Sequence, residues 1–291
     1  MTLAGRVRRK FKRAYLSLLS DEAYVRDIYR LRLGRNPDLV HPLLFSEKVQ
    51  WLKLHEDPVY KSRFVDKLGV RAIVTERIGA QYLNELYFSL EDAEHLHIDM
   101  LPSAFVLKAT HGSGFVLICK DRNAFDIETA RRTLSHWLSY DYGSRLRERQ
   151  YCYVPRKIIC ERYLEDDSGS LRDYKVLCFD GVPRLIWVDV DRQSNHQRAF
   201  FTTDWTRMPV TLKYPDYSGA IGKPGNLSEM LDLARELSRG FQFSRIDFYF
   251  SGGRTIFGEV TFHPEGGFAE FEPLSFGREV GAWIPVSSTT H

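Results

Sequence analysis

The 291-residue sequence has few cysteines and no long hydrophobic run. It contains no CxxC pair and no zinc-like cysteine group, so we expect free thiols in a cytosolic protein. No apolar stretch approaches the roughly 20 residues that cross a bilayer, and no signal-peptide pattern is recognised. These absences argue against a disulfide scaffold, a structural zinc site and a membrane-spanning protein. The four cysteines are Cys119, Cys152, Cys160 and Cys178.

Acidic residues are absent from the first 20 positions, which carry six bases. The rest of the chain has 35 bases and 38 acids, although the whole chain has a net charge of +3. A surface with a slight acidic excess does not favour nucleic-acid binding. Within residues 1–20, apolar side chains recur at helical spacing between the bases, as in a helix on an anionic membrane surface. Packing on the protein's own domain is the alternative. The six bases are Arg6, Arg8, Arg9, Lys10, Lys12 and Arg13.

The secondary structure predicted from the sequence changes after about residue 103, from mostly helices to short strands with fewer helices. Residues 21–103 are mostly of helical pattern, with expected helices at 20–34, 45–56 and 64–79, the second capped by Ser46. Short strands follow at 105–108, 115–119 and 157–164, with helices at 126–140 and 226–241. Two hairpins are expected, at 173–192 with a turn at Asp180-Gly181, and at 245–263 with a turn at SGGR.

The second hairpin places a carboxylate inside a strand-like run, IFGEVTF. Alternation puts Ile246, Phe248 and Phe250 in the core with Ile256, Val260 and Phe262, so the opposite face carries Arg245, Asp247 and Tyr249 with Phe257, Glu259 and Thr261. Two neighbouring carboxylates, Asp247 and Glu259, repel unless a cation lies between them. A divalent ion such as magnesium resolves the repulsion. A solvated sheet face neutralised by Arg245 is the alternative.

Lysines accompany a glycine-rich loop. Lys108 ends the strand FVLK just before a loop with Gly112, Ser113 and Gly114, where backbone N–H groups can approach phosphate oxygens. Neither a Walker loop nor GxGxxG is present. Further candidates are Lys67, Lys157, Glu161 at a strand exit, and Lys175 inside a strand, where a lysine needs an anion or water.

Taken in order, these motifs resemble one family. DK at 67, FVLK…HGSG at 108–114, ERYLED at 161–166, DYK at 173–175, RID at 245–247 and GEVTF at 258–262 follow one another as in the ATP-grasp superfamily. They are most similar to its TupA-like branch, named for teichuronopeptide and polysaccharide biosynthesis. The resemblance runs from about Phe45 to about Gly281.

The resemblance implies an α+β ATP-grasp fold, in which two α+β lobes clasp the nucleotide after a mostly helical N-terminal region. We expect a basic amphipathic helix at 1–20, a helical region at 21–103, a lobe with lid and hinge at 104–165, and a C-terminal lobe with the metal site at 166–291.

The resemblance also implies roles for single residues, with ATP and Mg²⁺ as cofactors. Lys108 would contact the α and β phosphates under a cover formed by the glycine loop, and Lys175 would reach the terminal phosphates beside Arg245, these two being the catalytic residues. The implied ATP-binding residues are Lys67, Lys108, His111, Gly112, Ser113, Gly114, Lys157, Glu161, Arg162, Tyr163, Leu164, Glu165, Asp166 and Lys175. The implied metal ligands are Asp247, Glu259 and Thr261, the last standing where many relatives have Asn.

The expected function is an ATP-dependent carboxylate–amine ligase that forms an amide through an acyl phosphate, acting on a uronic acid or amino acid of a surface polysaccharide. Its partners are then a carboxylate and an amine, without nucleic acid. We expect it in the cytoplasm, with peripheral contact of residues 1–20 at the inner membrane face as one option. A kinase of a sugar hydroxyl on the same fold, a polysaccharide glycosyltransferase and a non-catalytic binding protein are the alternatives.

Overall fold

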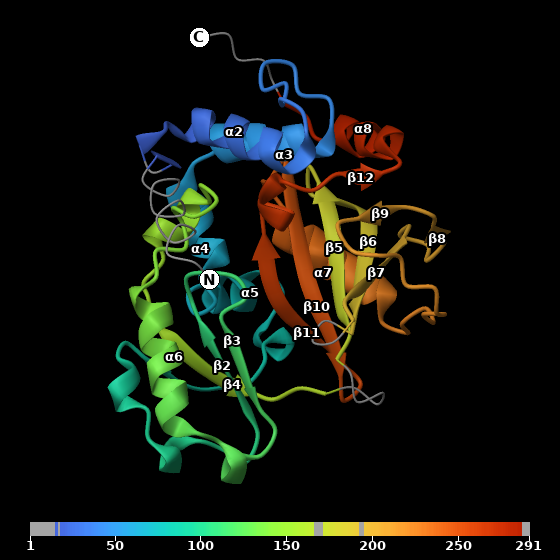
Figure 1. The fold of residues 1–291 in the computed structure, drawn as a ribbon. Helices are drawn as coiled ribbons and strands as arrows, with labels where there is room; N and C mark the ends of the chain where they lie inside the picture. The colour runs from blue at the N-terminus through green and yellow to red at the C-terminus, as the bar shows by residue number, and fades with distance from the viewer. Residues whose placement is uncertain (1–14, 17, 166–170, 192–194, 287–291) are drawn as a thin grey trace.

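The structure is a computed structural model that describes residues 15–16, 18–165, 171–191 and 195–286. Two antiparallel sheets form its framework (Figure 1). The smaller sheet has the strand order β1-β4-β2-β3, the larger one β11-β10-β5-β6-β7-β8, and a short pair joins β12 to β9. The strands are β1 (Leu86–Leu90), β2 (Phe105–Ala109), β3 (Val116–Cys119), β4 (Ile158–Arg162), β5 (Asp173–Phe179), β6 (Val182–Val190), β7 (Gln197–Phe201), β8 (Arg207–Met208), β9 (Thr211–Leu212), β10 (Phe243–Ser251), β11 (Arg254–Thr261) and β12 (Phe271–Glu272).

Helices cover both sheets and cross the top of the molecule in Figure 1. The α-helices are α2 (Asp21–Leu33), α3 (Phe45–His55), α4 (Pro58–Val65), α5 (Val70–Arg77), α6 (Ile127–Ser139), α7 (Leu227–Ser238) and α8 (Leu274–Ala282). Short 3-10 helices are η1 (Ala80–Tyr82), η2 (Ala93–His95), η3 (Ile98–Met100), η4 (Arg122–Ala124), η5 (Arg149–Tyr153) and η6 (Pro264–Gly267). Of the basic segment expected to be an amphipathic helix, 1–20, residues 1–14 and 17 lie outside the described residues, and these include all six bases.

Helix ends follow the sequence signals in α2 but not in α3. Ser20 accepts a hydrogen bond from the backbone N–H of Ala23 at 3.2 Å, and Gly34 ends α2 with a φ of 75°. Ser46, expected as a cap, instead lies inside α3. The side chain of Glu47 reaches back to the N–H groups of Leu43 and Leu44, both at 3.1 Å. A glutamate in the first turn therefore caps this helix, because its longer side chain reaches two free donors.

The single helix expected at 64–79 is interrupted. Helix α4 ends at Val65, and α5 begins at Val70. Asp66 makes the break, since its Oδ1 accepts the N–H of Leu68 at 2.9 Å, a local bond that competes with helix continuation. The break leaves Lys67 in the turn between the two helices, where its side chain points to the space between the sheets.

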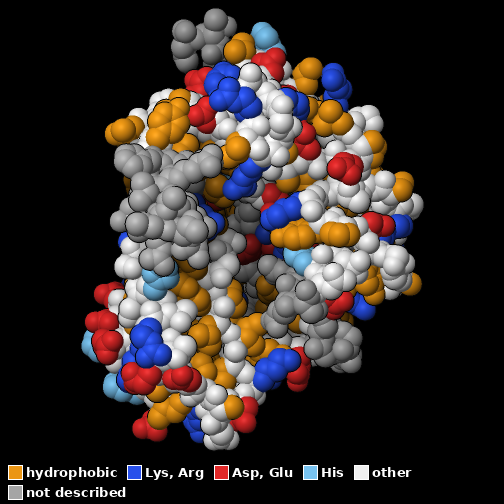
Figure 2. All heavy atoms as spheres, in the orientation of Figure 1, with side chains coloured by type: hydrophobic (Ala, Val, Ile, Leu, Met, Phe, Trp, Pro, Cys, Tyr) orange, Lys and Arg blue, Asp and Glu red, His pale blue; other side chains and the backbone are white. Residues whose placement is uncertain are grey.

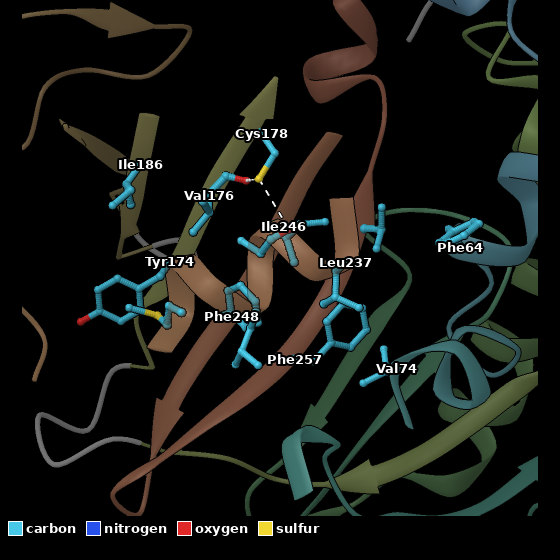
Figure 3. Close-up of a cluster of buried hydrophobic side chains, with 14 of the residues drawn as sticks. Phe64, Val74, Tyr174, Val176, Cys178, Ile186, Leu237, Ile246, Phe248 and Phe257 are labelled. Carbon is cyan, nitrogen blue, oxygen red and sulfur yellow. Dashed lines mark hydrogen bonds between the residues drawn. The ribbon is translucent and has the colours of Figure 1, made fainter. Parts of the chain in front are cut away.

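One face of the larger sheet forms the main hydrophobic core with α4, α5 and α7 (Figure 3). Alternate residues of β5, β6, β10 and β11 meet the apolar stripe of α7 there, as the period of two along a strand requires. The labelled members are Phe64, Val74, Tyr174, Val176, Cys178, Ile186, Leu237, Ile246, Phe248 and Phe257. This packing immobilises the sheet and so fixes the side chains on its other face.

Two further cores hold the remaining elements. Helices α3 and α8 pack with Phe45, Phe271 and Phe276 over one end of the larger sheet, near Phe243 and Trp187. The smaller sheet packs against α6 in a separate cluster, which includes the buried residues Phe105, Leu107 and Leu134. Strand β1, from the mostly helical region 21–103, completes this smaller sheet by pairing with β4.

Both expected hairpins are present. Strands β5 and β6 turn at Asp180 and Gly181, with φ of 50° and 72°, and strands β10 and β11 turn at Gly252 and Gly253, with φ of 56° and 72°. Positive φ at both central residues is the geometry that matches strand twist in two-residue hairpins.

The faces predicted for the side chains of β11 are correct near Glu259 but wrong near Phe257. Asp247 pairs with Glu259 as expected, but the register then shifts and Phe248 pairs with Phe257. Phe257 therefore enters the main core, contrary to the expectation, and Ile256 pairs with Tyr249. The extra residue is Gly258, where an added Cβ would lie 3.1 Å from the carbonyl oxygen of Asp247. A glycine allows this bulge, which strict alternation does not foresee.

Candidate active site

A row of charged side chains crosses the polar face of the larger sheet. Asp247 on β10 lies between Glu259 of β11 and Lys175 of β5, which are its direct partners in the two ladders. Lys175 Nζ donates to Oδ2 of Asp247 at 2.8 Å. Asp247 and Lys175 are almost fully buried. The sequence-based expectation that Asp247 and Glu259 come close across two strands is met by this register.

Arg245 joins the two carboxylates. It forms two hydrogen bonds of 2.6 Å with Asp247 and one of 3.0 Å with Oε1 of Glu259. Thr261 also donates to this Glu259 oxygen, at 3.2 Å. Burial acts to lower the pKa of Arg245, but Asp247 and Glu259 outweigh it and hold the pKa above its usual range. The guanidinium is thus a permanent cation in this site.

Two carboxylates that the sequence analysis did not single out surround Lys175. Its Nζ contacts Asp173 and lies 3.9 Å from Oδ2 of Asp189, both of them buried. Burial raises the pKa of Asp247, against the lowering effect of Arg245 and Lys175. The alternation in DYK and VDV could have placed Asp173 and Asp189 on this face, because each is an odd polar residue in an apolar strand.

The oxygen donors here suit a hard cation in part. Two carboxylates and the hydroxyl of Thr261 lie together, and magnesium prefers such ligands, completed by water and substrate phosphates. Within the described residues no group of three or more His, Cys, Asp or Glu side chains is arranged to hold a metal by itself. Asp247 and Glu259 would therefore supply a half-site, and an incoming ion would share them with Arg245.

A pocket lies between the smaller sheet and strand β11 of the larger sheet, next to this row. Figure 2 shows a hollow in the middle of the face, with Lys or Arg side chains on its rim and carboxylates inside. The pocket lies between β2 and β4 on one side and β11 on the other. Its lining residues are Lys67, Arg71, Leu83, Asn84, Lys108, Glu161, Phe257 and Gly258.

Two lysines are held in this pocket by polar contacts: Lys67, from the turn between α4 and α5, and Lys108, from β2. Lys108 Nζ lies 2.7 Å from Oε2 of Glu161, and Arg71 lies 3.4 Å from Oε1 of the same side chain. Lys67 donates to the carbonyl of Gly112 at 2.6 Å and lies 3.9 Å from Oε2 of Glu259. Burial lowers the pKa of Lys67. Lys67 thus connects the glycine loop of one lobe with the acidic row of the other.

Sequence reasoning missed the other lining residues. Arg71 follows Lys67 by four positions, a spacing that would have placed both on one side of the single helix expected at 64–79. Asn84 and Leu83 lie in a connection with no distinctive pattern. Phe257 and Gly258 reach the pocket only because of the bulge.

In the hinge expected at residues 161–166, several backbone groups are already hydrogen-bonded to other parts of the protein. The N–H of Arg162 donates to the carbonyl of Glu85 at 3.0 Å, and its carbonyl accepts from Asn84 at 2.9 Å. Ser251 of the larger lobe donates to the carbonyl of Glu165 at 2.6 Å. Nζ of Lys120 lies 5.7 Å from the centre of the Tyr163 ring. Leu164 is the next residue, and Asp166 lies outside the described residues.

Of the expected site residues that the structure describes, Lys67, Lys108 and Glu161 line the pocket, and the others, including Lys157 and His111, do not. Lys157 pairs with Glu91 at 2.9 Å, away from the lining residues. His111 is buried, with Nε2 3.0 Å from the carbonyl of Trp137, and burial lowers the pKa of its ring. It packs under the glycine loop and is not part of that loop's exposed surface.

The glycine loop itself combines a close approach with a left-handed turn. An added Cβ on Gly112 would lie 2.8 Å from the ring of Tyr142, and Gly114 has a φ of 79° with open space beside it. Ser113, between them, is exposed. The loop can thus turn sharply at Gly114 while Gly112 packs on Tyr142.

Solved structures similar to this chain include two ligases. The ATP complex of D-alanine–D-alanine ligase from Bacillus anthracis is 14% identical and aligns with 70% of this chain and 56% of its own, with a TM-score of 0.44. L-amino acid ligase from Bacillus licheniformis is 13% identical, over 85% of this chain and 55% of its own, with a TM-score of 0.46. This chain thus matches little more than half the length of either ligase. A comparison with curated proteins finds no match.

The family pattern extends over most of the chain. The TupA-like ATP-grasp model matches residues 47–285, which include both sheets, the glycine loop and the charged row. The α+β arrangement of two lobes around a lysine-lined pocket is the architecture expected from the resemblance. The chain therefore belongs to the TupA-like ATP-grasp family and has the ATP-grasp fold.

Proposed function

We propose that the protein is an ATP-dependent ligase that joins a carboxylate to an amine. The observation that supports this best is that the pocket lysines lie next to the charged row. Lys67 and Lys108 line the pocket, and Lys67 lies 3.9 Å from Glu259, which binds Arg245. Cations beside carboxylates that can hold a metal are the groups that phosphoryl transfer needs.

Nucleotide binding would use the small lobe. Lys108 and Lys67 would contact phosphate oxygens, and the loop Gly112–Gly114 would close over them. Because Lys108 now pairs with Glu161, phosphate would compete with that carboxylate for the ammonium group. Glu161 to Leu164 would meet the adenine, with Glu165 or Asp166 on the ribose.

The larger lobe would carry the chemistry. Asp247 and Glu259 would hold magnesium, with Thr261 as a third oxygen, and the ion supplies charge neutralisation at the phosphates. Lys175 and Arg245 would lie beside the phosphoryl group that passes to the substrate carboxylate. An amine would then attack the acyl carbon, the bond to the phosphate oxygen would break, and amide and phosphate would leave.

The substrate class follows the family resemblance. A uronic acid or an amino acid of a surface polysaccharide, or its precursor, is the proposed carboxylate. Within the described residues no helix has the length and apolar character to cross a membrane. Residues 1–20 are proposed to bring the cytoplasmic enzyme to the anionic inner face of the membrane. Sedimentation with phosphatidylglycerol vesicles tests this: binding should disappear when the six bases are replaced by Gln.

Hydroxylamine trapping tests the reaction itself. The enzyme is incubated with ATP, magnesium and a panel of uronic and amino acids, and both ADP and hydroxamate are measured. Hydroxamate that requires ATP and carboxylate indicates an acyl phosphate and supports the ligase. ADP together with a stable phosphate ester, and without hydroxamate, would show a kinase. No ATP turnover with any carboxylate, together with turnover of a sugar nucleotide, would point to a glycosyltransferase.

A further inference from the structure

The residues that line the pocket include one carboxylate and three cations. Glu161 lies there with Lys67, Arg71 and Lys108. Glu161 is only 7% exposed. A buried carboxylate that loses its counter-charge is costly, because water does not replace the lost partner. A ligand that draws one cation away from Glu161 therefore depends on the cation that stays.

Lys108 is the cation that a phosphate can draw away. Its Nζ lies 2.7 Å from Oε2 of Glu161, and in the described part of the chain this ammonium group has no second polar partner. A lysine carries its charge on a flexible aliphatic stem. Rotation of that stem moves the charge from Glu161 to a phosphate oxygen that enters the pocket.

Arg71, in contrast, is anchored. Its Nη2 donates to the carbonyl of Asn84 at 2.8 Å, and its Nη1 lies 3.4 Å from Oε1 of Glu161. Asn84 is itself buried, and its Nδ2 donates to the carbonyl of Arg162 at 2.9 Å while its Oδ1 accepts the N–H of Glu85 at 2.9 Å. The guanidinium is thus tied to the end of β4, the strand that carries Glu161.

Lys67 is held by other groups. Its Nζ donates to the carbonyl of Gly112 at 2.6 Å and lies 3.9 Å from Oε2 of Glu259. Burial lowers the pKa of Lys67, and the charges of Glu259 and Glu161 oppose this effect. Glu161 thus acts on Lys67 through charge at longer range. Arg71 is the cation that remains in contact with Glu161 once Lys108 has left.

We propose that Arg71 becomes the main partner of Glu161 when Lys108 moves to the phosphates, and thereby maintains the affinity of the pocket for phosphate. This inference rests on the ATP binding proposed above. The 3.4 Å separation leaves the guanidinium room to shorten to the roughly 2.7–2.9 Å of a charged hydrogen bond. Arginine suits this role, because its planar fork fits a carboxylate and its charge is permanent. Arg71 is a positioning residue and does not itself contact phosphate.

Binding of inorganic tripolyphosphate, titrated by calorimetry without magnesium, tests this exchange of partners. The ligand carries phosphate charge and no nucleobase, so a contact between Glu161 and adenine does not enter the result. In Arg71→Met the Kd should rise about tenfold or more, because the departing Lys108 leaves a buried carboxylate without a contacting cation. In Glu161→Gln the Kd should fall below that of the wild type, since a neutral amide does not compete with phosphate for Lys108.

A double variant separates positioning from direct contact. With Gln at position 161, Arg71 has no carboxylate to hold. Adding Arg71→Met to Glu161→Gln should therefore change the Kd by less than about twofold. A tenfold loss that persists in the double variant would show that Arg71 binds phosphate itself or supports the fold, and it would overturn the proposal.

The remaining variants are controls. Arg71→Gln keeps an amide donor without the charge and should lose affinity as Arg71→Met does. Arg63→Met removes an exposed arginine of α4 and should bind as the wild type does. All variants are also titrated with a non-hydrolysable ATP analogue, for which the same loss in the two single Arg71 variants is expected.

Two results overturn the inference in distinguishable ways. Unchanged Kd values for both ligands in Arg71→Met and Arg71→Gln overturn the role of Arg71, while ATP binding stands. A wild type that binds neither tripolyphosphate nor the ATP analogue overturns the proposed ATP-dependent function, and this inference with it.

Discussion

Asp247 and Glu259 lie opposite each other on adjacent strands, and the guanidinium of Arg245 binds both. Without a cation between them the two carboxylates would repel. The same three side chains face the lysine-lined pocket through Glu259, which lies 3.9 Å from Lys67. Glu259 therefore interacts both with Arg245 of the larger sheet and with Lys67, which also binds the glycine loop.

Replacing Glu259 by Gln should weaken the contribution of magnesium to nucleotide binding. The amide keeps the size of the side chain but removes one of two carboxylates. We expect a non-hydrolysable ATP analogue to gain affinity with magnesium in the wild type and to lose most of that gain in Glu259→Gln. Calorimetric titration with and without magnesium measures the difference. Glu272→Gln, at an exposed position of β12, serves as the matched control. An unchanged magnesium effect would remove Glu259 from the metal site.

Replacing Lys108 by Met should lower nucleotide affinity even without magnesium. A hydrogen bond to a charged group contributes about 1.5–3 kcal/mol, which corresponds to about a ten- to hundredfold change in Kd. The exposed Lys223→Met is the control for loss of one positive charge. Equal Kd values for the two variants in a fluorescent nucleotide titration would show that Lys108 serves only to neutralise Glu161.

Replacing Gly258 by Ala should disturb the bulge that separates Glu259 from Phe257. The new Cβ would meet the carbonyl oxygen of Asp247 and the ring of Tyr249, each at 3.1 Å. We expect a loss of about 1–3 kcal/mol in the free energy of unfolding, as for other overpacked sites. Gly222→Ala is the control, because nothing lies within 4 Å of its added Cβ. Urea unfolding compares the two; if both variants match the wild type, the bulge tolerates a side chain.

Replacing Glu47 by Gln should destabilise the protein at neutral pH and much less in acid. Burial by itself raises the pKa of Glu47, but the N–H of Leu44 and the guanidinium of Arg35 outweigh it, so the pKa lies below the usual 4.5. A lowered carboxyl pKa contributes stability above pH 4.5, and this contribution disappears as the pH falls through the folded-state pKa.

The expected loss at pH 7.5 is about 1–3 kcal/mol in the free energy of unfolding, since buried donors lose an ionised acceptor. Urea unfolding at pH 7.5 and again near pH 4 measures it. Glu22→Gln removes an exposed partner of Arg26 and should change little at either pH. A constant difference between Glu47→Gln and wild type at both pH values would contradict the role of its charge.

Local pattern was enough to predict the hairpins, the pairing of Asp247 with Glu259 and the caps of α2. These features depend on period-two alternation, on glycines at positive φ and on side chains within four positions of each other. The resemblance to the ATP-grasp superfamily extended this to the two lobes, because an ordered series of motifs carries more information than any one of them.

The tertiary structure decided which charged residues meet. Asn84 comes from a connection without a distinctive pattern, and only the packing of distant elements brings it and Arg71 to the pocket. The same packing places Lys157 beside Glu91 and His111 beneath the glycine loop, although the family resemblance predicts both as ATP-binding residues. Strand periodicity specifies the face on which a side chain lies. Burial and its neighbours across the chain specify what that side chain can do.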